Sequence, residues 1–292
     1  MRVTDTMVYN ATNTSLANDR AALQAVTEKV SSGKQLNRPS DNPADVRTSV
    51  GLNDTLAQIN QYLRNIDTAS SKVSAMDTAL GSAGDLIQRA NELAIEGANG
   101  TLSSDERKAI AAEVDQLKEA MAQDASAKVG DDYVFSGFRV DKAPYQVTGP
   151  GQVSAYAGDH GAIVARIGQS STMQINLSGD SVFQPAIDAL TQLQTDLNSG
   201  QPVQQTTIGQ ISSSLQTILQ ARATVGAREN RLDDAKSSQQ SLVTTNQALL
   251  SQLEDTDMAS AITELTQRQT TYQASLAVTA KVMQTSLIDY LK

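Results

Sequence analysis

The residues of this chain that could support acid–base or nucleophilic chemistry are few and scattered. The 292 residues include one histidine and no cysteine, so thiolate nucleophiles, thiolate metal ligands and disulfides are excluded. His160 follows Gly158 and Asp159 and precedes Gly161. Glycines on both sides indicate a surface turn, and an isolated histidine in a turn is more often solvated than catalytic or metal-ligating. A histidine-based active site is therefore not predicted.

Three groups of acidic residues could be considered as metal ligands: 131–132, 233–234 and 254–257. Neighbouring carboxylates on a helix point to different faces, and none of these groups has the alternating acids and glycine of a calcium loop. No glycine-rich phosphate-binding sequence follows an expected strand either. The sequence therefore predicts no catalytic residue, no cofactor and no metal site, and the chain is not expected to be an enzyme.

Composition and charge restrict the partners. The formal net charge is -9, and lysine and arginine form no cluster along the chain. Nucleic acid and anionic membrane surfaces are therefore not expected partners, because binding to them depends on counterion release by basic residues. The sequence has no run of about 18 apolar residues, the length that a transmembrane helix requires. Residues 1–6 also lack the apolar stretch of a general secretory signal.

Apolar residues recur at every seventh position over long stretches. Ile59, Ile66 and Val73 follow this step, as do Ile211 and Ile218. A seven-residue repeat keeps one stripe of a helix facing a partner along its whole length. Aromatic residues make up only 3% of the chain, so the core must be built from thin layers of small aliphatic side chains, as in narrow helical bundles. We expect a mainly α protein with a long helical coiled-coil rod formed by both chain ends.

Capping residues predict where the helices begin and end. Gly33 is the usual residue just beyond a helix C-terminus, and Asn42 followed by Pro43 is typical of a helix start. Ser103 and Glu106 have the spacing of a capping box. The expected helices span about residues 15–32, 43–96, 103–130, 186–197, 208–253 and 258–292.

The middle of the chain differs from both ends. Short runs rich in β-branched and aromatic residues alternate there with glycine-containing turns, which indicates strands. The expected strands lie at residues 133–135, 153–156, 162–167 and 173–177. We predict that residues 131–182 form an inserted β-rich outer domain, and that residues 1–130 and 183–292 form the helical part.

The stripes near the chain ends predict an interface between copies of the chain. Apolar repeats usually mark an intramolecular core, but this pattern continues to within a few residues of both ends, where ordinary domains fray. Amphipathic ends poor in aromatic residues fold better against copies of themselves than alone, so we expect them to become ordered on assembly. The predicted interface residues are Leu16, Leu23, Val26, Val30, Val225, Leu232, Leu253, Ile262, Leu265, Tyr272, Leu276 and Met283.

Two separate blocks resemble the flagellin family. Residues 31–44, Ser-Ser-Gly-Lys-Gln-Leu-Asn-Arg-Pro-Ser-Asp-Asn-Pro-Ala, resemble its N-terminal signature, and residues 225–232, Val-Gly-Ala-Arg-Glu-Asn-Arg-Leu, followed by residues 254–257, are similar to its C-terminal block. The chain departs from the common pattern at Asn42, which replaces the second acid of Asp-Asp-Pro, and at Asp45 and Val46, which replace Gly-Leu. The matching motif residues are Ser32, Gly33, Leu36, Asn37, Asp41, Pro43, Ala44, Gly226, Ala227, Asn230 and Arg231.

Within the family, three segments are more similar to the subunits that join the hook to the filament than to flagellin itself. They are the start Met-Arg-Val-Thr at residues 1–4, the run Tyr-Val-Phe-Ser-Gly-Phe at 133–138, and the ending Ser-Leu-Ile-Asp-Tyr-Leu-Lys at 286–292. The resemblance implies a structural subunit of the bacterial flagellum, exported through the flagellar type III channel without a cleaved signal. Its implied partners are copies of itself, hook-associated protein 1 on the hook side, flagellin on the filament side and an export chaperone.

Three other interpretations remain open from the residues. The chain could be flagellin proper, the filament subunit. It could be an enzyme with its site in the β-rich segment, although no group of residues supports one. A helical type III effector or translocator is disfavoured, because the sequence contains no apolar membrane segment.

Overall fold

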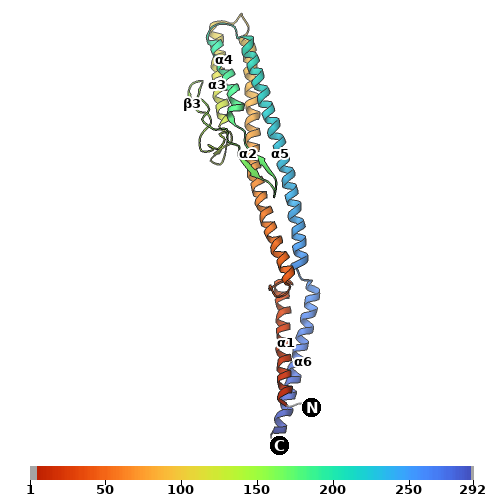
Figure 1. Cartoon of the computed structure of the whole chain (residues 1–292). Coiled ribbons are helices and arrows are strands. Elements are labelled where there is room, and N and C mark those ends of the chain that lie inside the picture. Colours follow the sequence, from red (N-terminus) through yellow and green to blue (C-terminus); the bar gives the residue numbers. More distant parts are fainter. Residues whose placement is uncertain (1–4, 291–292) are drawn as a thin grey trace. The chain divides into compact units, whose positions relative to one another are not determined.

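The computed structural model describes the backbone of residues 5–290 and the side chains of residues 7–281. These residues form six helices and three two-stranded antiparallel sheets (Figure 1). The mainly helical class with small sheets in the middle of the sequence is therefore confirmed. The helices are α1 (Asp5–Ser32), α2 (Pro43–Gly97), α3 (Ser104–Ala125), α4 (Gly179–Asn198), α5 (Gln205–Glu254) and α6 (Met258–Tyr290).

The predicted caps form as expected. Gly33 has a φ of 70° just beyond α1, which is the left-handed conformation that glycine adopts at low cost. The Asn42 side-chain oxygen accepts hydrogen bonds from the amides of Ala44 (3.2 Å) and Asp45 (3.3 Å) at the start of α2. At the start of α3, the Ser103 hydroxyl accepts from the Glu106 amide, and the Glu106 carboxylate accepts from the Ser103 amide.

Two helix starts differ from the prediction. Helix α1 begins at Asp5, ten residues earlier than expected, because pairing with α6 supports a stretch whose Asn and Thr residues have little helix propensity of their own. Helix α4 begins at Gly179, so Pro185 lies inside it and not before it. The packed side of α4 compensates for the hydrogen bond that Pro185 cannot donate.

The strands of the middle segment form separate hairpins, and the four predicted strands are shorter than expected. Two further strands, Lys128–Val129 and Val147–Gly149, were not predicted; the first lies in a stretch that was expected to be helical, but α3 ends at Ala125. The paired strands are β1 (Lys128–Val129) with β2 (Asp132–Tyr133), β3 (Val147–Gly149) with β4 (Gln152–Val153), and β5 (Val164–Arg166) with β6 (Thr172–Gln174). Buried Phe135, Tyr145 and Met173 belong to the same apolar cluster as side chains of the helices. The assignment of residues 131–182 to an outer domain of their own stays a prediction.

The chain divides into two compact units. The terminal unit comprises residues 1–58 and 242–292, and the central unit comprises residues 59–241. In the central unit α3 and α4 lie side by side (Figure 1). Its core contains Phe135 and Phe183, whose rings meet edge to face with centroids 4.9 Å apart. Such ring pairs contribute beyond the area that they bury.

Charged groups inside the central unit are satisfied by neutral partners. The buried Arg107 guanidinium donates to the carbonyls of Gly97 (3.4 Å) and Asn99 (3.3 Å), which closes the end of α2. The buried Lys118 ammonium donates to Gln194 Oε1 at 2.7 Å. Burial lowers the pKa of Lys118, and the nearby Asp115 carboxylate partly opposes this shift.

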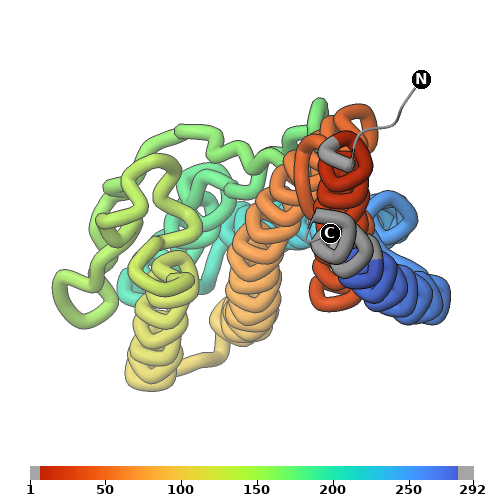
Figure 2. The backbone as a smooth tube through the Cα atoms, turned by 90° about the horizontal axis from the view of Figure 1, so that it is seen from below, coloured from red at the N-terminus to blue at the C-terminus, as the bar shows by residue number. Residues whose placement is uncertain are grey.

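The terminal unit is built on α1 and α6, which lie side by side (Figure 2). The Ser275 hydroxyl on α6 donates to the Asp19 carboxylate on α1 at 2.6 Å. Among the described side chains of this unit, Val26 and Ala261 are the only buried apolar ones. The two helices therefore pair along one face and leave several large apolar side chains exposed.

Candidate assembly interface

Large apolar side chains are exposed on both helices of the terminal unit. Tyr9 on α1 is 46% exposed, and Ile262, Leu276 and Val278 on α6 are 50%, 41% and 59% exposed. Isolated exposed apolar residues are common, whereas several of them on one pair of helices favour an interaction surface. We call the exposed apolar faces of α1 and α6 the terminal apolar surface.

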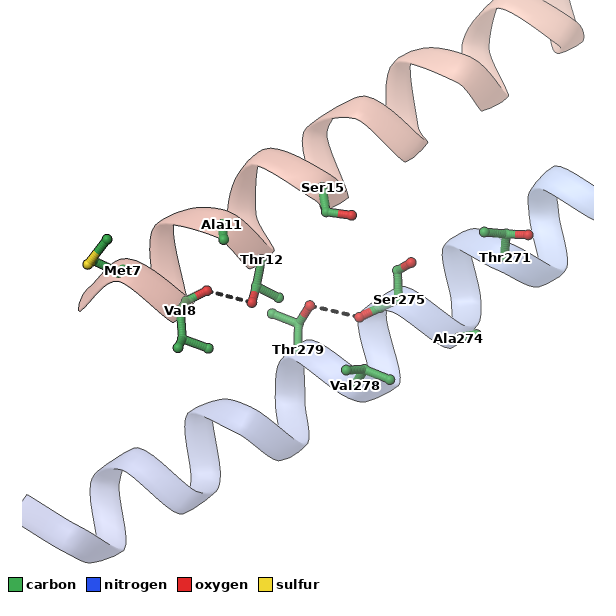
Figure 3. Close-up of a pocket in the computed structure, with 10 residues that line it drawn as sticks. All are labelled: Met7, Val8, Ala11, Thr12, Ser15, Thr271, Ala274, Ser275, Val278 and Thr279. Atoms are coloured by element: carbon green, nitrogen blue, oxygen red, sulfur yellow. Dashed lines mark hydrogen bonds between the residues drawn. The ribbon is translucent and has the colours of Figure 1, made fainter. Parts of the chain in front are cut away.

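A groove of about 710 Å³ runs between α1 and α6 (Figure 3). Met7 and Val8 line it from α1, and Val278 lines it from α6. The hydroxyl groups of Thr12 and Thr279 turn back to the carbonyls of their own helices, at Val8 and Ser275, each at 2.7 Å (Figure 3). No charged residue lines the groove. It therefore suits an apolar side chain better than a polar ligand.

The predicted interface residues fall into several environments. Val26 is buried between the terminal helices, whereas Ile262 and Leu276 are exposed on α6. Val225 and Leu232 are fully buried in the core of the central unit. The half-buried members are Leu16, Leu23, Val30, Leu253, Leu265 and Tyr272. Met283 lies in α6, but its side chain falls outside the described part of the chain. The role of this set between copies stays a prediction.

The N-terminal motif builds the turn between α1 and α2. The Ser32 hydroxyl accepts from the Lys34 amide at 3.1 Å, and the Asn37 side-chain amide donates to the Lys34 carbonyl at 2.8 Å. The Asp41 carboxylate accepts from the amides of Asn37 (3.1 Å) and Arg38 (2.8 Å). The motif residues therefore act here by fixing the backbone of a connection that has little apolar packing.

The other residues of this motif lie at the two edges of the turn. Gly33 follows α1 with its positive φ, Leu36 is half-buried, and Pro43 and Ala44 are the first two residues of α2. Proline in the first turn of a helix costs no hydrogen bond, because the amides there have no partner within the helix.

The C-terminal motif lies on α5. A Cβ added to Gly226 would meet no atom within 4 Å, so packing does not require this glycine. Ala227, Arg228 and Arg231 line a shallow groove of about 390 Å³ beside β6. Arg228 donates to the Asn176 carbonyl at 2.9 Å, and burial lowers the pKa of Arg228. The fourth motif residue, Asn230, is exposed on the same helix.

The structure brings together two motif segments whose contact the sequence did not predict. The backbone N–H of Gln35 donates to the backbone carbonyl of Glu254 at 2.6 Å, and the Lys34 ammonium lies 2.6 Å from the Glu254 carboxylate. These residues are about 220 positions apart. The only sequence signal was that each segment lies in one of the two family blocks, and this signal says nothing about their distance in space.

The described residues offer surfaces for packing and no arranged set of reactive groups. His160 is exposed in a loop, with Nδ1 3.2 Å from the Ser178 hydroxyl. Within the described residues, no three His, Asp or Glu side chains lie close enough together to hold a metal ion. No helix in the described part of the chain has the length and apolar character needed to span a membrane.

Comparison with known proteins assigns the family. Residues 3–139 match the bacterial flagellin N-terminal helical region, and residues 208–291 match the bacterial flagellin C-terminal helical region. The chain belongs to the bacterial flagellin family. It is a structural subunit of the bacterial flagellum.

Individual relatives refine this picture. Flagellar hook-associated protein 3 of Escherichia coli K12 is 26% identical over 323 aligned positions, which cover 100% of both chains. Flagellin FlaB2 of Treponema pallidum is 26% identical and covers 92% of this chain and 91% of its own. The crystal structure of the flagellar junction protein FlgL from Legionella pneumophila has a TM-score of 0.58 and 16% identity, covering 71% of this chain and 99% of that one. This structural likeness shows that the two chains share a fold.

Proposed function

We propose that this chain is the subunit that joins the hook of the flagellum to the filament. The observation that carries the proposal is the alignment with hook-associated protein 3 of Escherichia coli, which extends over the full length of both chains. That alignment includes the middle segment as well as the helical ends. The features at residues 1–4, 133–138 and 286–292 support the same role.

The terminal apolar surface is the proposed contact between copies. In the single chain, Ile262, Leu276 and Val278 keep about half of their surface in water. Complete burial of an exposed side chain of this kind contributes roughly 1.5–3 kcal/mol, so covering the exposed half of each against a neighbouring copy would contribute about half of that amount. In a ring of copies, every pair of neighbours makes the same contact, so contacts that are weak individually add up to a stable assembly. Residues 131–182 are then the proposed outer part of the ring.

The proposed neighbours are hook-associated protein 1 on the hook side and flagellin on the filament side. The subunit reaches its place by flagellar type III export, held by an export chaperone beforehand, and functions outside the cell. It acts by packing and carries no catalytic step.

Flagellin proper is the second candidate function. It is favoured by the similarity to flagellin FlaB2 of Treponema pallidum, which covers 92% of this chain. The two candidates differ in where the subunit is found, because a junction subunit occupies one short zone and a filament subunit occupies the whole length.

Electron microscopy of antibody-labelled flagella tests the proposal. Label confined to the boundary between hook and filament is the expected result, and label along the filament would establish the flagellin alternative. An antibody against the organism's filament protein is the control for access along the filament. Deletion of the gene is expected to leave hooks without filaments and to release flagellin into the medium.

A further inference from the structure

Both helical runs of the terminal unit are interrupted at the same place, and the two interruptions are fastened to each other. Helix α1 ends at Ser32, and helix α5 ends at Glu254. Just beyond them, Lys34 and Asp255 form an antiparallel β-bridge. The backbone N–H of Gln35 donates to the backbone carbonyl of Glu254 at 2.6 Å, and the backbone N–H of Thr256 donates to the Gly33 carbonyl at 2.9 Å. We call this set of contacts the clasp.

The Glu254 side chain ties three segments together in the clasp. One carboxylate oxygen lies 2.6 Å from the Lys34 ammonium in the turn after α1, and the other accepts a hydrogen bond from the Ser49 hydroxyl on α2. The Glu254 side chain is only 13% exposed, and Ser49 is buried. Hydrogen bonds to an ionised group shielded from water are stronger than neutral or exposed ones.

Lys34 and Glu254 each stabilise the ionised form of the other. The hydrogen bond from Lys34, followed by that from Ser49, holds the pKa of Glu254 below its usual range. The hydrogen bond to Glu254 raises the pKa of Lys34. Both groups are therefore ionised at neutral pH, and neither can be removed without leaving the other poorly paired.

Apolar packing is sparse in this region. The described side chains of the terminal unit bury only Val26 and Ala261 among apolar residues, and a Cβ added to Gly33 would meet no atom within 4 Å. Two helix breaks that lie next to each other, with few buried apolar side chains around them, have the properties of a hinge. The direction in which the α1 and α6 pair continues from the ends of α2 and α5 then depends on the polar contacts of the clasp.

We infer that Glu254 is a positioning residue for assembly: by holding the clasp closed, it sets the direction of the paired helices α1 and α6 so that the terminal apolar surfaces of neighbouring copies meet in register. The role of Glu254 in assembly rests on the proposed function. The clasp itself is a property of the single chain and can be measured without any assembly.

The absence of cysteine from the chain allows a direct distance measurement. Spin labels attached through Ala17→Cys on α1 and Asp54→Cys on α2 report across the clasp, and both positions are exposed. A second pair, Ala17→Cys with Gln269→Cys on α6, reports within the helix pair. Double electron–electron resonance then gives the distribution of distances for each pair.

The test variant is Glu254→Gln, and the matched control is Glu264→Gln. Glu264 forms an exposed pair with Arg268 one turn away on α6, so its substitution removes the same charge without touching the clasp. In Glu254→Gln, the ratio of chains with the clasp contacts formed to chains with these contacts broken is expected to fall roughly three- to tenfold, as for the loss of one charged hydrogen bond. This change is read from the distances between the labels at positions 17 and 54. The distance within the α1 and α6 pair is expected to remain unchanged, as are both distances in Glu264→Gln.

Two further results decide the inference. The exchanged pair Lys34→Glu with Glu254→Lys is expected to restore a narrow distance distribution and normal incorporation at the junction. An unchanged distance across the clasp in Glu254→Gln would overturn the inference, as would a loss of the distance within the helix pair, since that would show a role in folding alone. A widened distribution with normal incorporation would also overturn it. Labelling along the filament, by contrast, would overturn the proposed function and leave the clasp measurement intact.

Discussion

The central and terminal units carry similar apolar repeats, but the repeats are buried in the central unit and largely exposed in the terminal unit. All fully buried members of the large apolar cluster, from Ile66 to Leu232, lie in the central unit. The terminal unit buries only Val26 and Ala261 among its described apolar side chains. The difference lies in the number of helices available: side chains from α2, α3, α4 and α5 surround the central core, whereas α1 and α6 can cover only one face of each other.

This comparison separates folding from assembly. A buried cluster of aliphatic and aromatic side chains supplies the stability of the single chain. An exposed apolar face adds nothing to that stability until a partner covers it. We therefore expect substitutions in the central unit to lower the free energy of unfolding, and substitutions on the terminal apolar surface to affect incorporation.

The largest effect is expected for Phe183→Ala. Phe183 is fully buried against Phe135, and removal of such a ring leaves a cavity that costs about 3–5 kcal/mol of unfolding free energy. Urea denaturation followed by circular dichroism measures the loss. The control is Phe138→Ala, because Phe138 is 66% exposed, and its loss is expected to be much smaller. Equal losses for the two variants would contradict the location of the core.

A smaller effect is expected for Gly97→Ala at the end of α2. An added Cβ would lie 2.8 Å from Leu197 Cδ2 and Val203 Cγ2, and this overpacking is expected to cost about 1–3 kcal/mol. The control is Gly226→Ala on α5, where the added methyl group has open space. That substitution is expected to stabilise the helix by roughly 0.5–1 kcal/mol. Stabilisation by both variants in thermal or urea unfolding would show that the end of α2 is loosely packed.

Acid is expected to loosen the clasp before it unfolds the central unit. The pKa of Glu254 in the folded chain lies below its ordinary value of 4.5, so the contribution of this group is fully present above that value. The contribution is lost as the pH falls through the lowered pKa. The spin-label distance between positions 17 and 54, followed from neutral pH to about pH 3, is expected to broaden only below the ordinary value. Broadening well above it, or an identical pH dependence in Glu254→Gln, would assign the transition to another group.

The smallest effect on folding is expected for Leu276→Asp. Leu276 is 41% exposed on α6, so the free energy of unfolding is expected to change by no more than about 0.5 kcal/mol. Incorporation at the junction is expected to fail, with flagellin released into the medium of cells that carry only this variant. Gln273→Asp, at an exposed position on the same helix, adds the same charge and is the control. A large loss of stability with normal incorporation would place this face of α6 in the core of the single chain.

Local signals were enough to predict most of the helical framework. Gly33, Asn42 and the pair Ser103 and Glu106 act at the helix ends where the sequence placed them. The start of α1 and the position of Pro185 inside α4 were missed. In both cases, contact with a neighbouring helix outweighs a local signal against helix formation.

The candidate interface could be predicted only in part. Ile262 and Leu276 are exposed as a surface for other copies requires, but Val225 and Leu232 occupy equivalent repeat positions and lie in the core of the central unit. A heptad repeat states that one face of a helix will be covered, and it does not state which partner covers it.

The sequence by itself determined the helical class, the main helix ends and the family, because caps, periodicity and motifs are read from neighbouring residues along the chain. Tertiary structure alone decided which stripes are buried and which remain open, because burial depends on how many helices meet at each level. It also joined Lys34 to Glu254 across about 220 positions, a contact that exists only because two helix breaks come to lie side by side.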